Sequence, residues 1–116
     1  MNNLYDVKAI VDEYLTETGR YMEKERHNAD TIDELHDIFR EAERKFNDGL
    51  AKLHALKLSR DDRRHFSLIT GAFATAMKSC QYGAKGRYKH AVDKMAECNR
   101  LVAQYVMRQL GRVSKS

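Results

Sequence analysis

Apolar side chains recur at alternating spacings of three and four residues through the segment 32–56, and this repeat constrains the fold more than any other feature of the chain. Its positions are Ile32, Leu35, Phe39, Ala42, Phe46, Gly49, Leu53 and Leu56. A helix with this repeat carries one apolar stripe, which neighbouring helices must cover, as in a helical bundle or a coiled coil. None of the 116 residues is proline, so no position forces a break in a long helix.

Signals that begin or end a helix separate this segment from its neighbours. The first two signals are a hydroxyl side chain followed three residues later by an acid, a pattern that caps the free amides of a new helix. The third is a pair of glycines suited to ending a helix in a turn. The three signals are Thr31 with Glu34, Ser59 with Asp62, and Gly83 with Gly86.

These boundaries predict one domain, residues 1–116, with four helices of similar length and a short basic tail. The helices are expected at 3–26, 31–57, 60–82 and 87–110, with the tail at 111–116. Because short loops cannot span the length of a bundle, each helix must run antiparallel to the next. The predicted fold is therefore an all-α, antiparallel, up-down-up-down four-helix bundle.

The hairpin of the second and third helices predicts which residues meet across their interface. With its turn near Leu58, Phe46 would lie opposite Gly71 and Gly49 opposite Leu68. A large side chain would then face a small one at both positions, as a well-packed core requires.

One short segment suggests a different helical architecture. Residues 86–91, preceded by Tyr82, resemble the inter-helix turn of a tetratricopeptide repeat, in which a glycine, an aromatic residue and an alanine recur at this spacing. The resemblance covers roughly a third of the chain and implies a stack of helix pairs. Such repeats need about three copies of ~34 residues to bury a core, and only one copy is visible. The bundle is the preferred prediction.

Charge divides the chain into an acidic and a basic half. Residues 1–58 carry 9 Lys and Arg against 13 Asp and Glu, a net charge of −4, while residues 59–116 carry 12 against 4, a net charge of +8. This asymmetry is typical of a protein with an anionic partner such as nucleic acid, and equally of a protein whose two halves attract each other.

The last helix supplies the candidate residues for binding a partner or nucleic acid. They are Lys85, Arg87, Lys89, Lys94, Arg100 and Arg108. Asp93 and Glu97 lie among them on the outward face, whereas helices that contact phosphates usually keep that face free of acids. This arrangement favours a solvated face over a dedicated nucleic-acid surface.

Other motifs limit the compartment and the chemistry. No segment approaches the ~18 apolar residues of a membrane span, and residues 1–12 lack a signal-peptide pattern, so we expect a cytoplasmic protein without membrane contact. Cys80 and Cys98 fall on apolar seams and are expected to be buried, reduced thiols. The chain has no Glu-x-x-His motif, nucleophile elbow or phosphate-binding glycine loop, and we expect no metal or cofactor.

Arg60 and His65 form the one pair that suggests catalysis. Their spacing fits the loose pattern of HEPN ribonucleases, which are small helical bundles in which an Arg and a His of one helix face each other across a dimer. The resemblance implies a metal-independent ribonuclease in which the imidazole acts as acid or base and the guanidinium stabilises charge on the phosphate. The alternative interpretation is a solvated, acid-capped first helical turn, which is the preferred one.

The segment 66–77 contains no charged residue, and we expect a second subunit to cover its face carrying Leu68, Ala72 and Thr75, giving a homodimer.

Because no catalytic constellation is stronger than its structural alternative, we predict a small non-enzymatic interaction protein. It would act as a regulator, inhibitor or accessory subunit that docks onto a larger protein or nucleoprotein complex. A nucleic-acid-binding accessory protein and a HEPN-like dimeric ribonuclease are the two alternatives.

Overall fold

The computed structural model describes the backbone of residues 4–114 and the side chains of residues 5–60 and 63–109. Within these residues the chain forms four long helices and one single-turn helix, with no strand. The first long helix, residues 4–28, is continuous but has a π-helical middle, and we call it the N-terminal helix. Its parts are α1 (Leu4–Ile10), η1 (Val11–Thr16) and α2 (Glu17–Asn28).

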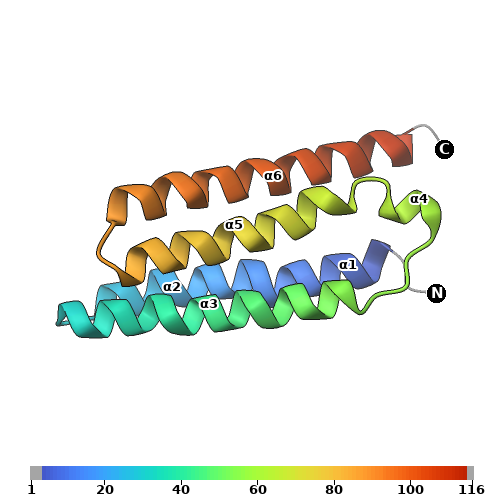
Figure 1. Cartoon of the computed structure of the whole chain (residues 1–116). Coiled ribbons are helices and arrows are strands. Elements are labelled where there is room, and N and C mark those ends of the chain that lie inside the picture. The colour runs from blue at the N-terminus through green and yellow to red at the C-terminus, as the bar shows by residue number, and fades with distance from the viewer. Residues whose placement is uncertain (1–3, 115–116) are drawn as a thin grey trace.

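The remaining helices complete an antiparallel bundle. They are α3 (Ile32–His54), the short α4 (Arg60–Arg63), α5 (Phe66–Ala84) and α6 (Tyr88–Ser114). Figure 1 shows the long helices running alternately in opposite directions, with α5 between α3 and α6 and the N-terminal helix behind α3. The predicted all-α, up-down-up-down four-helix bundle is confirmed.

Two of the predicted helix boundaries have the expected local chemistry. At the start of α3, the Thr31 hydroxyl accepts a hydrogen bond from the Glu34 amide at 3.1 Å, and the Glu34 carboxylate accepts one from the Asp30 amide at 2.9 Å. At the end of α5, Gly86 has φ +80, and the amides of Gly86 and Arg87 bond to carbonyls of the last helical turn. This turn is a Schellman motif, which needs a left-handed residue.

The third predicted helix is interrupted near its beginning. α4 starts at Arg60 as expected but lasts one turn, and α5 begins only at Phe66. The Arg63 guanidinium donates to the carbonyls of Leu56 and Leu58, which ties this turn back to the preceding loop. The expected cap by Asp62 falls on a side chain outside the described residues, and so does the first expected helical residue, Asn3. The predicted end of the last helix at 110 is too early, because α6 continues to Ser114 and takes in most of the predicted tail 111–116.

The inserted turn changes the register between α3 and α5. A Cβ added to Gly49 would meet the Phe73 ring at 2.6 Å, and one added to Gly83 would meet the Phe39 ring at 2.5 Å. Each pair is symmetric about position 61, whereas the predicted pairing was symmetric about a turn near Leu58. Large side chains do face small ones, but the partners of Phe46 and Gly49 were predicted wrongly.

Helix α5, which begins with the uncharged segment 66–77, is central in the bundle. Ile69, Ala72, Phe73, Ala76 and Cys80 are all fully buried, because α5 packs against α3 on one side and α6 on the other. The dimer surface predicted through Leu68, Ala72 and Thr75 is therefore wrong at its centre. Leu68 is partly buried against the core, and the Thr75 hydroxyl donates to the Gly71 carbonyl of its own helix at 2.7 Å.

We expect the buried glycines to be sensitive to a single methyl group. Gly49→Ala would drive a Cβ into Tyr14 and Phe73, and we expect it to lower the free energy of unfolding by about 1–3 kcal/mol. Gly71→Ala is the matched control, since the nearest atom to its Cβ would be Leu101 Cδ1 at an ordinary 3.7 Å, and it should raise stability by about 0.5–1 kcal/mol. Urea unfolding followed by circular dichroism measures both, and equal effects would contradict this packing.

Candidate functional site

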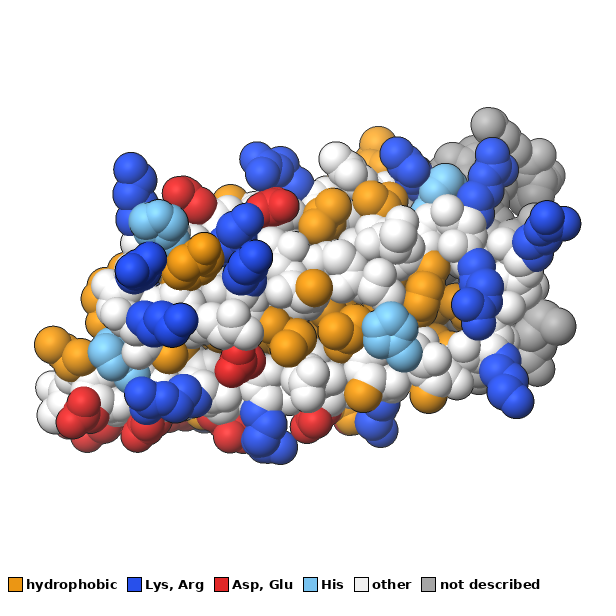
Figure 2. All heavy atoms as spheres, viewed as in Figure 1, with side chains coloured by type: hydrophobic (Ala, Val, Ile, Leu, Met, Phe, Trp, Pro, Cys, Tyr) orange, Lys and Arg blue, Asp and Glu red, His pale blue; other side chains and the backbone are white. Residues whose placement is uncertain are grey.

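The predicted basic residues do not form one surface. Lys85, Arg87 and Lys89 lie at the turn between α5 and α6, whereas Arg108 lies about 30 Å further along α6 at a rise of 1.5 Å per residue. Figure 2 shows one face of the molecule. Most of its acidic side chains lie along the edge formed by α3, and its basic side chains lie over α6 and at both ends of the bundle. The charge division seen in the sequence is thus a division between the two hairpins.

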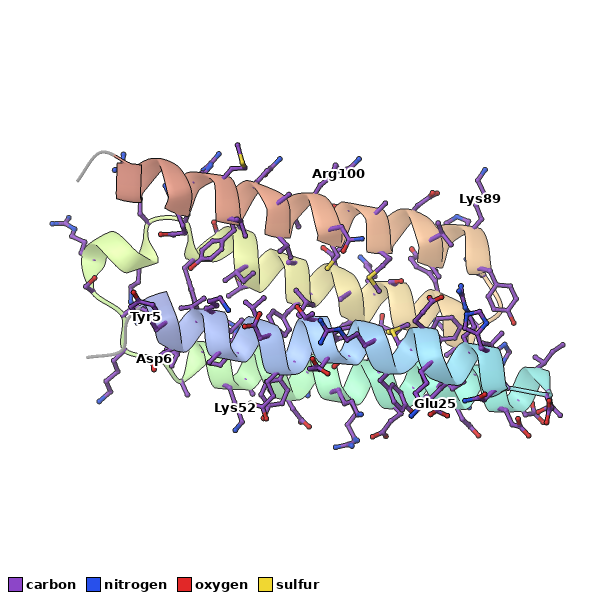
Figure 3. All side chains as sticks on the ribbon, turned by 180° about the vertical axis from the view of Figure 1, so that it is seen from behind. Tyr5, Asp6, Glu25, Lys52, Lys89 and Arg100 are labelled. Atoms are coloured by element: carbon purple, nitrogen blue, oxygen red, sulfur yellow. The ribbon has the colours of Figure 1, made fainter. Side chains whose placement is uncertain are left out.

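These basic side chains differ in what they contact. Lys94 pairs with Glu97 at 3.1 Å, and an Arg108 amino group donates to His65 Nδ1 at 3.2 Å. Lys85, Arg87, Lys89 and Arg100 are exposed and form no ion pair with the residues that the structure describes. Figure 3 shows Lys89 and Arg100 projecting away from the bundle.

The geometry of Arg60 and His65 departs from the HEPN pattern. Arg60 begins α4, His65 precedes α5, and the chain turns between the two helices. The two residues therefore do not lie on one helix, as the resemblance requires. His65 instead accepts a hydrogen bond from Arg108, so Nδ1 is engaged within the chain.

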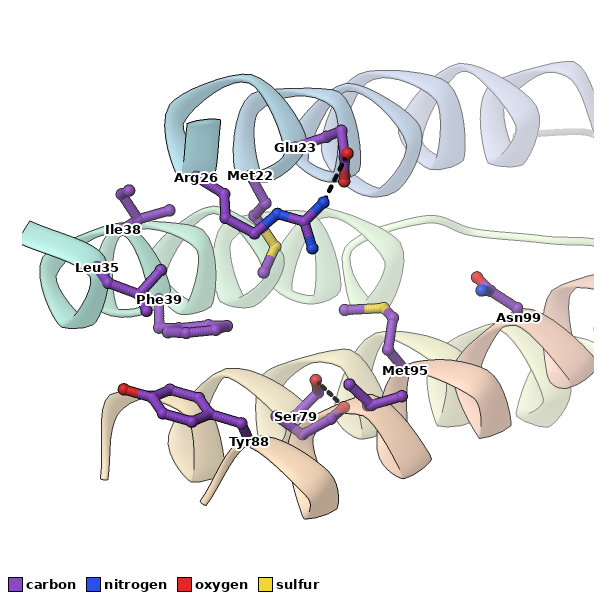
Figure 4. Close-up of a pocket in the computed structure, with 13 residues that line it drawn as sticks. Met22, Glu23, Arg26, Leu35, Ile38, Phe39, Ser79, Tyr88, Met95 and Asn99 are labelled. Carbon is purple, nitrogen blue, oxygen red and sulfur yellow. Dashed lines mark hydrogen bonds and ion pairs between the residues drawn. The ribbon is translucent and has the colours of Figure 1, made fainter. Parts of the chain in front are cut away.

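A cleft that sequence reasoning missed lies between the N-terminal helix and α6. Its volume is about 500 Å³, and α3 and α5 also contribute to its wall. Figure 4 shows Met22 of α2 and Met95 of α6 pointing toward each other across it. The other large apolar side chains along the cleft are Leu35, Ile38, Phe39 and Val92.

Apart from Asn99, the polar side chains that line the cleft already have partners inside the chain. Glu23 pairs with Arg26 at 2.7 Å, the Ser79 hydroxyl donates to the Ala91 carbonyl at 2.6 Å, and the Tyr88 hydroxyl bonds to His36 Nε2 at 2.9 Å. An occupant of the cleft would therefore be held chiefly by apolar contacts. Methionines at both walls suit such a role, because their unbranched side chains adapt to different partners.

Gly19 marks the open side of the cleft. A Cβ added there would have no atom within 4 Å, in contrast with Gly49 and Gly83. A larger side chain at position 19 can therefore enter the cleft without displacing the core. The sequence pattern placed Gly49 in an apolar repeat, but it gave no sign that Gly19 borders a cleft.

The apolar surface continues from the cleft along the outer side of α6. Its residues have the same alternating spacing of four and three as a bundle seam, and we call them the α6 seam: Val92, Ala96, Asn99, Ala103 and Val106. All five are exposed, with Val92 at 67% and Val106 at 47%. A second helical repeat in the sequence, offset from the buried one, was the signal that could have revealed it.

Both cysteines are buried and free. Burial, with smaller contributions from Glu43 and Cys98, raises the pKa of the Cys80 thiol to about 12, and burial raises the pKa of Cys98 to about 11. Thiols in this state are poor nucleophiles, because the reactive form is the thiolate. They act as core residues.

Neither a metal site, nor a membrane span, nor a known relative identifies the function of the cleft. Among the described residues, no group of three or more His, Cys, Asp or Glu side chains could hold a metal ion, and no helix is long and apolar enough to cross a membrane. Comparisons with protein-family models, curated proteins and solved structures found no match for this chain.

We expect both thiols to resist labelling in the folded protein. At about pH 8, a thiol with a pKa of about 11 has about 100-fold less thiolate than one at the ordinary 9.0. The folded chain should also lose stability as pH rises from 9 toward 12, because the unfolded chain then releases protons that the folded chain retains.

Thiol labelling with and without denaturant, and urea unfolding at about pH 8 and pH 10, measure the two effects. Replacing both cysteines with alanine isolates their share of the pH dependence from that of lysine and tyrosine. Rapid labelling of the folded chain would show that Cys80 or Cys98 is accessible, against this structure.

Proposed function

We propose that this protein is a non-enzymatic interaction protein that docks onto a larger protein by taking one of its apolar helices into the cleft between α2 and α6. The observation that carries the proposal is the cleft itself, with apolar walls from two helices that do not close on each other. An amphipathic helix laid into an apolar groove is a common mode of protein recognition.

The chemistry of the cleft favours a helix over a small polar ligand. Small-molecule sites usually present several polar groups that converge on the ligand and fix its orientation. Here the Glu23, Arg26 and Ser79 side chains bond within the chain. Among the lining residues, only Asn99 has no hydrogen bond to a residue that the structure describes, and one such group does not fix the orientation of a small ligand. The α6 seam also extends the apolar surface about 21 Å, from Val92 to Val106, at a rise of 1.5 Å per residue.

Nucleic acid is the second candidate partner, and one local feature favours it. Lys85, Arg87 and Lys89 are exposed around the turn that also presents Tyr88 and His90. Cations next to aromatic rings suit single-stranded nucleic acid, whose phosphates and bases they contact. One face of the Tyr88 ring is already stacked on Phe39, however, and His90 packs against Tyr82. The rings are thus partly used within the bundle, and the apolar cleft is the stronger feature.

Gly19 provides a sharp test of cleft docking. We expect Gly19→Leu to fill the cleft and reduce capture of the partner from an extract of the native cell at least tenfold, while Gly19→Ala, which adds only a methyl group in open space, retains it. Both variants should stay folded, because Ala and Leu are better helix formers than Gly. Quantitative mass spectrometry of the captured proteins makes the comparison.

Nuclease treatment separates the two candidates. Proteins captured by the parent and by Gly19→Ala, lost with Gly19→Leu and indifferent to nuclease would support the cleft. Capture that persists with Gly19→Leu but disappears after nuclease treatment would reject docking in the cleft and support nucleic acid as the partner. Equal capture by all three chains, with or without nuclease, would reject docking in this cleft.

A further inference from the structure

The α6 seam, together with the flanking Met95 and Val102, is complementary to itself. Val92 and Val106 each lie seven residues from Asn99, one on either side. Met95 and Ala103 each lie four residues from it. Ala96 and Val102 each lie three residues from it.

If two copies of α6 lie antiparallel with their Asn99 residues side by side, each of these pairs meets across the interface. Val92 of one copy faces Val106 of the other, Met95 faces Ala103, and Ala96 faces Val102. Two of the three pairs place a large side chain against a small one, as close packing requires. Each contact occurs twice, which is the property of a two-fold symmetric interface.

Parallel pairing would not pack in this way. It would place Ala96 on Ala96 and Ala103 on Ala103, leaving gaps, and Val92 on Val92. Asn99 faces its own copy in either orientation, and the antiparallel one places it on the symmetry axis. Its amide both donates and accepts hydrogen bonds, so two Asn99 side chains can bond to each other at the symmetry axis. A single buried Asn in an apolar seam fixes the register of paired helices.

We propose that the protein is a homodimer in which the α6 seams of two copies pair antiparallel about Asn99, covering the docking cleft until a partner helix displaces the second copy. The dimer itself is inferred from the residue pattern and the exposure of the α6 seam. Its role in covering the cleft rests on the proposed function, because Val92, Met95 and Asn99 belong to both surfaces.

Charge predicts how this dimer responds to salt. Arg100 projects from the outer side of α6 one residue beyond the axis, so the two Arg100 side chains would lie near each other. Like charges repel, and salt screens the repulsion. The dimer should therefore tighten as salt rises, and Arg100→Gln should tighten it at low salt.

Sedimentation velocity tests the association without any partner protein. The parent should be a dimer in the micromolar range, and Val106→Glu should be a folded monomer at the same concentration, since position 106 is exposed and its charge would be buried only in the dimer. Gln104→Glu is the matched control, because Gln104 is exposed on α6 outside the seam, and it should remain dimeric. A parent that is monomeric at ~100 µM, or a Val106→Glu variant that stays dimeric, would overturn the proposal.

Disulfide formation tests the orientation. Under mild oxidation, Asn99→Cys should cross-link to itself, and an equimolar mixture of Val92→Cys and Val106→Cys should cross-link mainly between the two variants. The native thiols are buried and do not compete. Efficient cross-linking of Val92→Cys with itself would indicate parallel pairing and contradict the two-fold axis at Asn99.

These outcomes are separable from those of cleft docking. Val106 lies outside the cleft and Gly19 lies outside the α6 seam. Loss of the dimer in the parent would leave the Gly19→Leu result unaffected, and a failure of partner capture would leave the sedimentation result unaffected. If the second copy covers the cleft as proposed, Arg100→Gln, which tightens the dimer at low salt, should capture less partner than the parent under those conditions, and unchanged capture would contradict the covering role.

Discussion

The close approach of α3 and α5 is the contact on which the rest of the structure depends. At Gly49 and Gly83 a phenylalanine ring of the opposite helix occupies the space where a Cβ would be. Gly49 also receives Tyr14 of the N-terminal helix, and Gly71 of α5 receives Leu101 of α6. Glycines thus permit the close approach of α3 to α5 and to the N-terminal helix, whereas the contact of Gly71 with Leu101 is an ordinary one. The remaining pair, the N-terminal helix and α6, has only Gly19 at its boundary, and no ring fills that position.

Electrostatic interactions contribute little to holding the two halves of the chain together. Every ion pair that the structure shows between described residues joins positions three or four apart on one helix. Exposed pairs of this kind are each worth about 0.3–0.5 kcal/mol. The acidic first hairpin and the basic second hairpin are instead joined through the apolar core, and their opposite charges remain on the surface.

The fold could be predicted from the sequence because local signals and the apolar repeat agree. The Thr31 cap, the turn at Gly86 and the repeat in α3 each act within one helix or one turn, where the chemistry of a few residues decides the structure. The α3–α5 register was not predictable in the same way. It depends on the length of the connection, and the single turn of α4, tied back by Arg63, lengthens that connection.

The candidate site was missed for a related reason. An uncharged segment such as 66–77 of α5 can be covered by its own chain or by another subunit, and its sequence pattern is the same in both cases. Only the packing shows that Ala72 is internal. In α6, a buried apolar repeat and the exposed α6 seam run along the same helix. The buried repeat accounts for the packing of α6 in the bundle, so the second repeat was not recognised as a surface, although its spacing is visible in the sequence.

The central claim is that one side of the bundle is left uncovered by its own chain and is covered by association. The labelling rate of Val92→Cys by a water-soluble thiol reagent, measured over a range of protein concentrations, tests this most directly, because the native thiols are buried. We predict rapid labelling in dilute solution and progressive protection as concentration rises. Protection that is complete at the lowest concentration would mean that the chain covers this side itself, and rapid labelling at every concentration would mean that a second copy does not; either result would contradict the account.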